Sequence, residues 1–386
     1  MNLAKAQSER WIPFVVVGLI LSTAMVQAAV GFNTVLFPVR LEDYGFSKTL
    51  IGICLSFEVA SVLVIVGSIN GIISRLGLVG TIFIATSGRL LMLLILSQTR
   101  SFPLWCFSIF GFGLTTYLIL IALQTWINGV PLQRYRGLVI GCFSSALSLG
   151  TASGPIVLNM VGVGGGARPF QASMGIVALS LLLLLPLLRF APVISSQPRL
   201  RLRYVIRMAR VPMMSSLVGG VTFFGLPAFL TLYGMMNGLS VQRASLLLSA
   251  FMVGSVSLGL LISILSDHVN RTLLIVACVL VGVVCAVYLP LGIYNYPIAL
   301  GLLFVWGGAA GGVYATGLAT VGHLFRQEDQ VSANVAYSMM DNLGGVISVL
   351  LIGFLMGAGI ADGIVFVTVF TALAYFIYCL SQLNQE

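Results

Sequence analysis

Residues 102–127 read FPLWCFSIFGFGLTTYLILIALQTWI, and no charged side chain interrupts them. A helix rises about 1.5 Å per residue, so about 20 apolar residues cross the roughly 30 Å hydrocarbon core of a bilayer. In lipid, every backbone hydrogen bond must be made within the protein, which leaves helices and closed barrels. Because a barrel strand needs only about ten residues, an apolar run of this length predicts a membrane-spanning helix.

Similar apolar runs occur along the whole chain of 386 residues. Hydrophobic residues make up 59% of the chain and charged residues 8%, whereas a soluble domain carries roughly 25% charged residues. Most of the exterior must therefore face lipid, and we predict an all-α membrane protein. Its twelve expected helices lie near residues 12–38, 49–73, 78–98, 102–127, 137–161, 170–190, 212–235, 243–266, 272–291, 296–320, 332–357 and 363–382.

The first apolar run has a second interpretation, because a short basic stretch precedes it and residues 26–28, Val-Gln-Ala, resemble a signal-peptidase site. Apolar character continues past that site to Phe37-Pro38, which gives enough residues for a full span. We therefore expect an uncleaved first helix.

The positive charge of the chain is concentrated in its loops. The net charge is +9, and the densest basic run lies between the sixth and seventh spans, at Arg199, Arg201, Arg203, Arg207 and Arg210. If the N-terminus is inside, thirteen lysines and arginines fall on its side of the membrane and five on the other. Cytoplasmic loops are enriched in these residues, so we expect an inner (plasma) membrane protein with both termini in the cytoplasm. A basic stripe with interleaved aromatics is absent from the sequence, which argues against nucleic-acid binding.

The two halves of the chain repeat each other. Residues 44–47 (YGFS) after the first span align with residues 237–240 (NGLS) after the seventh, at an offset of 193. Leu149-Gly150 aligns with Leu343-Gly344 at an offset of 194. Parallel repeats of six helices are a transporter architecture, with the substrate site between the repeats. We predict a six-helix bundle at 1–190, a cytoplasmic linker at 191–211 and a second six-helix bundle at 212–386.

Two loops carry a resemblance to a known family. Residues 70–77 read NGIISRLG, and residues 263–271, one repeat later, read SILSDHVNR. Both resemble the G-x-L-a-D-R-x-G-R loop of the major facilitator superfamily. The first copy keeps Arg75 and Gly77 but has Ser74 in place of the acidic residue, and the second keeps Asp267 and Arg271. The resemblance implies two pseudo-symmetric six-helix bundles that alternate between inward- and outward-open states, with a cytoplasmic latch between the acidic residue and the arginine.

The fifth span contains a small-residue motif, GTASGP at residues 150–155. Two glycines one turn apart let a neighbouring helix approach closely, and a proline bends its helix because it removes a backbone hydrogen bond. Gly150, Gly154 and Pro155 resemble the core of the motif that the drug:proton antiporter branch of the superfamily carries in this helix. The resemblance implies an exporter; the alternative is close packing without a specific function.

Three charged residues fall in the middle of predicted helices, where each costs at least about 2.5–3.5 kcal/mol: Glu58, Arg89 and Asp341. Glu58 and Arg89 lie at the same distance from the outer ends of consecutive antiparallel helices, so we predict an ion pair or a shared polar network. One interpretation is a static pin, since removing either partner would leave a buried charge. The other is a proton site, in which protonation of Glu58 frees Arg89 for an anionic substrate.

Asp341 lies in the eleventh span and has no cation near it in sequence. Burial without a partner favours a neutral carboxyl, which suits a group that takes up and releases protons. In the superfamily this helix lines the central path, so the resemblance makes Asp341 the preferred proton-coupling residue. The alternatives are a helix-packing hydrogen bond and a salt bridge to a residue distant in sequence.

The resemblance also places the first, fourth, seventh and tenth helices around the central cavity. The candidates for its lining are polar or aromatic, and Tyr337 beside Asp341 joins them: Gln27, Asn33, Tyr117, Gln124, Tyr233, Trp306, Tyr314 and Tyr337. A mixed aromatic and amide lining suits amphipathic ligands. Trp and Tyr also populate membrane interfaces, so each residue has lipid contact or packing as its alternative role.

We predict a secondary transporter and no enzyme, because the sequence contains no G-x-S-x-G, Walker or H-E-x-x-H signature. No metal or other cofactor is expected, and the proton gradient is the expected driving force. The expected partners are a small-molecule substrate, protons and membrane lipid, and the chain is expected to be a monomer. The predicted activity is proton-coupled export of a metabolite, drug or siderophore. An importer or uniporter on the same fold is the first alternative, and a membrane-embedded sensor or enzyme is the second.

Overall fold

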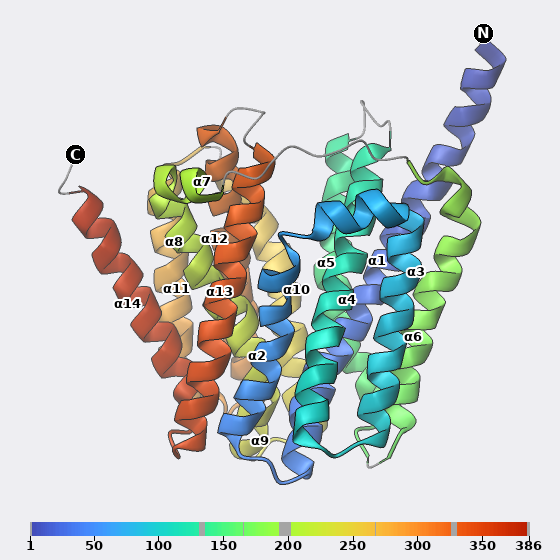
Figure 1. Ribbon diagram of the computed structural model, residues 1–386. Helices are drawn as coiled ribbons and strands as arrows, with labels where there is room; N and C mark the ends of the chain where they lie inside the picture. Colours follow the sequence, from blue (N-terminus) through green and yellow to red (C-terminus); the bar gives the residue numbers. More distant parts are fainter. Residues whose placement is uncertain are drawn as a thin grey trace. The chain divides into compact units, whose positions relative to one another are not determined.

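The computed structural model describes residues 2–130, 136–164, 166–192, 202–266, 268–325 and 330–383. Regular structure in these ranges is entirely helical (Figure 1). Eleven described stretches are long and apolar enough to cross a membrane, and a shorter apolar helix covers Gly363–Cys379. The predicted all-α membrane fold is therefore confirmed.

The helices follow the predicted spans except at the second, which was expected at 49–73 and ends at Ile65. The first six spans are α1 (Asn2–Asp43), α2 (Lys48–Ile65), α3 (Ile69–Gln98), α4 (Phe102–Gly129), α5 (Arg136–Val161) and α6 (Arg168–Leu184), which continues as the 3-10 helix η1 (Leu185–Phe190). A short helix, α7 (Leu202–Met208), precedes the seventh span, which consists of α8 (Arg210–Gly220), the π-helix η2 (Val221–Gly225) and α9 (Leu226–Met236). The last five spans are α10 (Val241–Leu265), α11 (Arg271–Gly292), α12 (Tyr296–Leu324), α13 (Gln330–Gly357) and α14 (Gly363–Leu383).

Contacts divide the chain into two compact units. The first unit contains residues 1–33 and 67–197, and the second contains residues 34–66 and 198–386. Residues 34–66 belong to the second unit because α2 packs along α13. The predicted linker at 191–211 contains α7, whose Val205 is fully buried against α8, α12 and α13 residues of the second unit. The linker remains a prediction as a domain boundary, and its residues 193–201 lie outside the described ranges.

The predicted repeat has the same backbone geometry at its two turns. Gly45 after α1 has a φ of 84° and Gly238 after α9 a φ of 83°, a left-handed conformation that glycine adopts without steric cost. Ser47 and Ser240 then cap the next helix: Ser47 Oγ accepts from the Leu50 N–H at 3.3 Å, and Ser240 Oγ accepts from the Arg243 N–H at 3.4 Å. The same sequence pattern therefore ends one helix and starts the next in both halves.

The repeat also has equivalent helix packing in its two halves. A Cβ at Gly150 on α5 would lie 2.5 Å from the Ala24 carbonyl oxygen on α1. In the second unit, a Cβ at Gly344 on α13 would overlap the Leu217 carbonyl oxygen on α8. These two pairs correspond at the offsets of 193 and 194 that align the sequences. Glycine thus allows two backbones to meet at the same place in each half.

Two backbone irregularities interrupt the helices. Gly77 inside α3 has a φ of 68° and a ψ of 172°, so Ile69–Leu76 forms a separate helical piece before the span begins at Leu78. That piece lies across the end of α3 in Figure 1. The π-helix η2 interrupts the seventh span just before Pro227. A proline has no N–H to donate to the preceding turn, which favours such a break.

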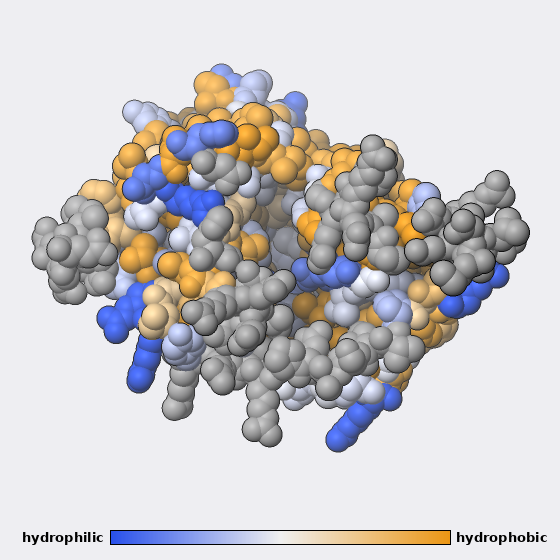
Figure 2. Space-filling model, turned by 90° about the horizontal axis from the view of Figure 1, so that it is seen from above, coloured by the Kyte–Doolittle hydropathy of each residue, from blue (hydrophilic) through white to orange (hydrophobic). Residues whose placement is uncertain are grey.

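The outer flanks of the helices are apolar, as lipid contact requires. Phe107, Met160, Leu291 and Phe370 expose 60%, 80%, 73% and 73% of their surface. Figure 2 looks onto the helix ends and shows hydrophilic residues (blue) on the visible face, among hydrophobic ones (orange). Exposed apolar flanks with polar helix ends are the pattern expected of a membrane-spanning bundle.

Candidate functional site

Asp341 lies in the middle of α13, in a close contact between α13 and α8. Its surface is 8% exposed. A Cβ at Gly220 on α8 would overlap the Asp341 carbonyl oxygen, and a Cβ at Gly219 would lie 3.6 Å from Asp341 Oδ1. The two glycines therefore let α8 pass directly beside this carboxyl group.

The carboxyl group of Asp341 has an unsatisfied oxygen. Oδ1 is buried and has no hydrogen-bond partner among the described residues. No lysine, arginine or histidine in the described part of the chain forms an ion pair with Asp341. A buried ionised carboxylate without such a partner is costly, so the neutral carboxyl is favoured at this position.

The π-helix η2 begins one residue after Gly220 and was not predicted from the sequence. A π-helical turn shifts the hydrogen-bond pattern from the fourth to the fifth residue, and such turns frequently occur at functional sites. The sequence signal that could have indicated it is Gly225-Leu226-Pro227, a glycine and a proline inside an otherwise apolar span. The irregular turn and the unsatisfied carboxyl oxygen are thus neighbours.

Aromatic side chains surround the same region of the second unit. The rings of Tyr314 on α12 and Tyr337 on α13 are 5.5 Å apart, and Phe223 of η2 lies 6.3 Å from Tyr314. The Tyr337 hydroxyl donates to the Tyr314 carbonyl oxygen at 3.1 Å, and Ser216 Oγ donates to the Tyr337 carbonyl oxygen at 2.6 Å. Of the predicted cavity residues, the structure thus brings Tyr314 and Tyr337 together one turn from Asp341.

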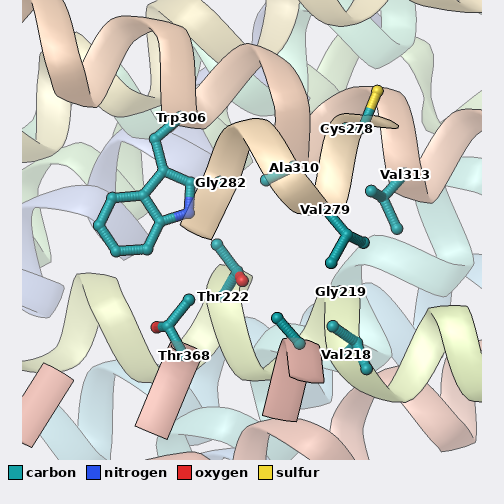
Figure 3. Close-up of a pocket in the computed structure, with 11 residues that line it drawn as sticks. Val218, Gly219, Thr222, Cys278, Val279, Gly282, Trp306, Ala310, Val313 and Thr368 are labelled. Atoms are coloured by element: carbon teal, nitrogen blue, oxygen red, sulfur yellow. The ribbon is translucent and has the colours of Figure 1, made fainter. Parts of the chain in front are cut away.

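Trp306 lines a small cavity of the second unit. Its side chain is 1% exposed, and its indole points into a space bounded by α8, η2, α11, α12 and α14 (Figure 3). The cavity has a volume of about 30 Å³. Its lining is mainly apolar, with two threonines: Val218, Gly219, Thr222, Cys278, Val279, Gly282, Trp306, Ala310, Val313, Thr368 and Ala372.

Tyr233, another predicted cavity residue, has a packing role in the structure. It is fully buried in α9, and its hydroxyl donates to Asp362 Oδ1 at 3.0 Å. Asp362 lies in the turn before α14. This bond connects α9 to the start of the last helix.

Arg89 is a fully buried charge of the first unit. Its guanidinium carbon lies 4.4 Å from the centre of the Phe112 ring on α4, and Nη2 donates to the Val26 carbonyl oxygen on α1 at 3.5 Å. A cation over an aromatic face is stabilised by the ring quadrupole. Glu58 is half-buried in α2 and belongs to the second unit. The pairing of Glu58 with Arg89 therefore remains a prediction.

The four predicted cavity residues of the first unit differ in their surroundings. Asn33 is fully buried and donates to Ser173 Oγ on α6 at 2.7 Å. Gln27 is half-buried, and its Nε2 lies 3.5 Å from Thr151 Oγ1 on α5. Tyr117 is half-buried and Gln124 is exposed, both on α4. Asn33 and Gln27 thus connect α1 to its neighbours within this unit.

The motif at 150–155 packs α5 against α1. A Cβ at Gly154 would overlap the Phe32 backbone nitrogen, and a Cβ at Gly31 would overlap the Thr151 carbonyl oxygen. Pro155 lies inside α5 and is buried. The close approach predicted for Gly150 and Gly154 is present in the structure.

The two superfamily-like loops are described only in part. Arg75 is exposed, and Gly77 adopts the positive φ that ends the short helical piece before the third span. Arg271 Nε donates to the Ser266 carbonyl oxygen at 3.3 Å. Asp267 lies outside the described residues, so the latch between the acidic residue and the arginine remains a prediction. Among the described residues, no group of three His, Cys, Asp or Glu could hold a metal ion.

Comparison with known proteins places this architecture in a family. The family model described as Major Facilitator Superfamily matches residues 19–348 and 213–383. The chain belongs to the major facilitator superfamily. The motif-based resemblance to this superfamily is therefore confirmed, and the protein is a multi-pass membrane protein of this family.

Relatives and solved structures of the superfamily agree with this assignment. The uncharacterized MFS-type transporter YfkF of Bacillus subtilis (strain 168) is 23% identical over 252 residues, which cover 63% of this chain and 63% of that protein. The chain thus matches less than two thirds of the length of this relative. A point variant of the nucleoside transporter NupG superposes with a TM-score of 0.78 at 15% identity, covering 94% of this chain and 99% of that one.

A second solved structure has the same fold. A bacterial homologue of the human lysosomal transporter Spinster, in an inward-facing and occupied conformation, superposes with a TM-score of 0.77 at 14% identity, covering 96% of each chain. At these identities the likeness shows the major facilitator fold.

Proposed function

We propose that this major facilitator exports a small organic molecule across the cytoplasmic membrane in exchange for protons, by alternating access. The observation that carries the proposal is the buried Asp341, whose Oδ1 has no hydrogen-bond partner among the described residues. A carboxyl group in such surroundings is costly to keep ionised, so its charge state responds to whatever approaches it. Residues of this kind inside membrane helices mark ion and proton pathways.

The neighbours of Asp341 suit a coupling role. Gly219 and Gly220 bring the backbone of α8 to the carboxyl group, and η2 follows directly. Discontinuous helices at mid-membrane are a recurrent feature of transporter binding sites. Loss of a proton from Asp341 would place a charge beside this irregular turn, which gives protonation a physical means of changing the helix.

The proposed substrate is amphipathic. Tyr314, Tyr337 and Phe223 form an aromatic cluster one turn from Asp341, and mixed aromatic and polar surroundings fit ligands with an apolar body and a few polar groups. Metabolites, drugs and siderophores remain in the proposed class. Nucleosides belong in the test panel because a structural neighbour is named as a nucleoside transporter.

Membership of the drug:proton antiporter branch is part of the proposal. Its support is the motif of Gly150, Gly154 and Pro155, whose glycines pack directly on α1. An importer or uniporter on the same fold is the alternative, and a membrane-embedded sensor or enzyme is the second. The proposed setting is the inner membrane, with both termini cytoplasmic, a monomeric protein, no cofactor and no nucleic-acid partner.

Transport in proteoliposomes under an imposed pH gradient tests the direction and the coupling. Labelled amphipathic compounds and nucleosides are loaded inside or outside, and the gradient is imposed in either sense. Proton-coupled export predicts that substrate moves against the direction of proton flow and accumulates beyond equilibrium. Accumulation in the same direction as the protons would identify an importer, and equilibration that ignores the gradient would identify a uniporter; either result would replace the proposal.

A further inference from the structure

The small cavity of the second unit is lined by three polar groups that have no partner among the described residues. They are the Thr222 hydroxyl on η2, the Thr368 hydroxyl on α14 and the Trp306 indole N–H on α12, which belong to residues that line the cavity (Figure 3). None of them forms a hydrogen bond to another described residue. Buried polar groups without a partner cost roughly 1–3 kcal/mol each, and native proteins commonly satisfy them with ordered water.

The size of the cavity matches water. Its volume is about 30 Å³, and a single water molecule requires about 10–15 Å³ of such space. One or two water molecules therefore fit, whereas an organic ligand does not. The indole donates a hydrogen bond and the two hydroxyls can donate or accept, so a water molecule here would find the two to four partners that it needs.

The cavity adjoins Asp341 through the missing side chain of Gly219. The place where a Cβ would stand at Gly219 lies 3.6 Å from Asp341 Oδ1 and 3.9 Å from Val313 Cγ1. Both Gly219 and Val313 line the cavity. The unpartnered carboxyl oxygen and the cavity therefore border the same small space, which any residue larger than glycine would fill.

Around Asp341, the titratable side chains of the packed helices are Tyr337 on α13, Tyr314 on α12 and Glu58 on α2, the helix that packs along α13. Cys278 on α11 and Tyr375 and Cys379 on α14 lie beyond them. Asp341 Oδ1 forms no hydrogen bond to Glu58 or to any other described residue. Tyrosine and cysteine are ordinarily neutral at pH 7. The described residues supply no cation that pairs with Asp341. Water is then the group that can both hydrogen-bond to Oδ1 and exchange a proton with it.

We propose that the cavity is an internal water site, held by Thr222, Thr368 and Trp306, and that its water hydrates Asp341 past Gly219. The carboxyl group transfers its proton to the oxygen of this water, which leaves a carboxylate and a hydrated proton, and the reverse transfer restores the neutral acid. The water that contacts the carboxyl group therefore lies in a cavity of the same unit. The inference rests on the proposed role of Asp341 only for its link to transport, and the water site itself stands on the cavity.

Hydroxyl-radical footprinting of the full-length protein tests the water site directly, because radicals generated from bound water oxidise the buried side chains beside it. Trp306 is expected to be oxidised several-fold faster than Trp105. Trp105 is the matched control: it is equally buried, it does not line the cavity, and its Nε1 donates to the Thr99 carbonyl oxygen at 2.9 Å. Ala310→Leu fills the cavity and should lower the oxidation rate of Trp306 to that of Trp105. Equal rates for both tryptophans in the unaltered protein would overturn the proposal.

Infrared spectroscopy tests the link to Asp341. The carboxyl band that Asp341→Asn removes is followed after transfer into D2O, at acidic pH. Gly219→Ala should slow exchange of this band by about tenfold or more, because its Cβ separates Oδ1 from the cavity at an ordinary contact distance. Oxidation of Trp306 should remain in this variant. Gly301→Ala on α12, where a Cβ meets nothing within 4 Å, is the control and should exchange like the parent.

The outcomes separate this inference from the proposed function. Unchanged exchange in both Gly219→Ala and Ala310→Leu would refute hydration of Asp341 through the cavity. If Asp341→Asn still accumulates substrate under a pH gradient while Trp306 is oxidised as expected, the proposed coupling role fails and the water site stands.

Discussion

Gly52 on α2 and Gly353 on α13 lie backbone against backbone: a Cβ on Gly52 would be 2.9 Å from the Gly353 α-carbon and 2.9 Å from the Val349 carbonyl oxygen. One turn further along, a Cβ on Gly357 would overlap Thr49 Oγ1. We call this contact between the glycines of α2 and α13 the glycine crossing. Through it α2, which belongs to the first half of the sequence, is part of the second compact unit. A contact between a helix from one half and a helix from the other is the kind of contact that a conformational cycle must make and break.

Gly353→Val tests this crossing. The added side chain must displace α2, and overpacking of this kind costs roughly 1–3 kcal/mol. We expect a lower melting temperature in detergent and weaker disulfide cross-linking between cysteines introduced on α2 and α13 at positions other than these glycines. Gly301→Val, at an open position of α12, is the control and should leave both measurements unchanged. Full cross-linking in Gly353→Val would mean that the crossing tolerates bulk.

Gly154→Leu tests the contact between α5 and α1 in the first unit. A side chain at this position would occupy the place of the Phe32 backbone nitrogen, so we expect loss of folded protein or a transporter held in one conformation. Size-exclusion profiles and transport rates separate these two results. Gly141 on the same helix has nothing within 4 Å of its Cβ position, and Gly141→Leu should behave like the parent. If Gly154→Leu transports at the normal rate, the contact between α5 and α1 is loosely packed and tolerates a large side chain.

The helices, the repeat and the burial of Asp341 could be predicted from the sequence, because bilayer thickness and the cost of buried charge act on local residue patterns. The rotation of each helix about its axis could not. A helix that is apolar on all sides carries no pattern that shows which face meets a neighbour. Trp306 lines a cavity of the second unit, and its predicted place at the central cavity stays a prediction.

Contacts between residues far apart in sequence could not be predicted either. The bonds from Asn33 to Ser173 and from Tyr233 to Asp362 join helices far apart in sequence, and a single sequence does not indicate such pairs. The π-helix η2 also escaped prediction, because its hydrogen bonds differ from those of an α-helix while its residues are ordinary for a span. The close helix contact at Gly150 and Gly154 could be predicted, because two small residues one turn apart indicate close packing whichever way they face.

Exchanging the charges of Glu58 and Arg89 tests whether these residues pair. Glu58→Arg alone or Arg89→Glu alone would leave like charges in the membrane, and removing a partner from a buried ion pair costs about 3–5 kcal/mol. We expect each single variant to lose most folded protein and the double exchange to recover it, as measured by yield and melting temperature. Arg89 also packs on Phe112 at 4.4 Å, so recovery should be partial. If the double variant is no better than either single one, the two residues do not form a pair.

Asp341→Asn separates coupling from folding at the candidate proton site. The amide is nearly the same size as the carboxyl group and cannot ionise, so the contact of α13 with Gly219 and Gly220 should survive and the melting temperature should stay close to that of the parent. Transport driven by a pH gradient should be abolished, whereas exchange of labelled for unlabelled substrate without a gradient should continue, because exchange needs no net proton movement. Asn342→Ala, at the neighbouring buried position where the amide donates to the Ser338 carbonyl oxygen at 2.8 Å, is the control for general damage to α13 and should keep the response to the gradient. Accumulation by Asp341→Asn at the parental level would remove this carboxyl group from the coupling mechanism and leave Glu58 with Arg89 as the next candidates.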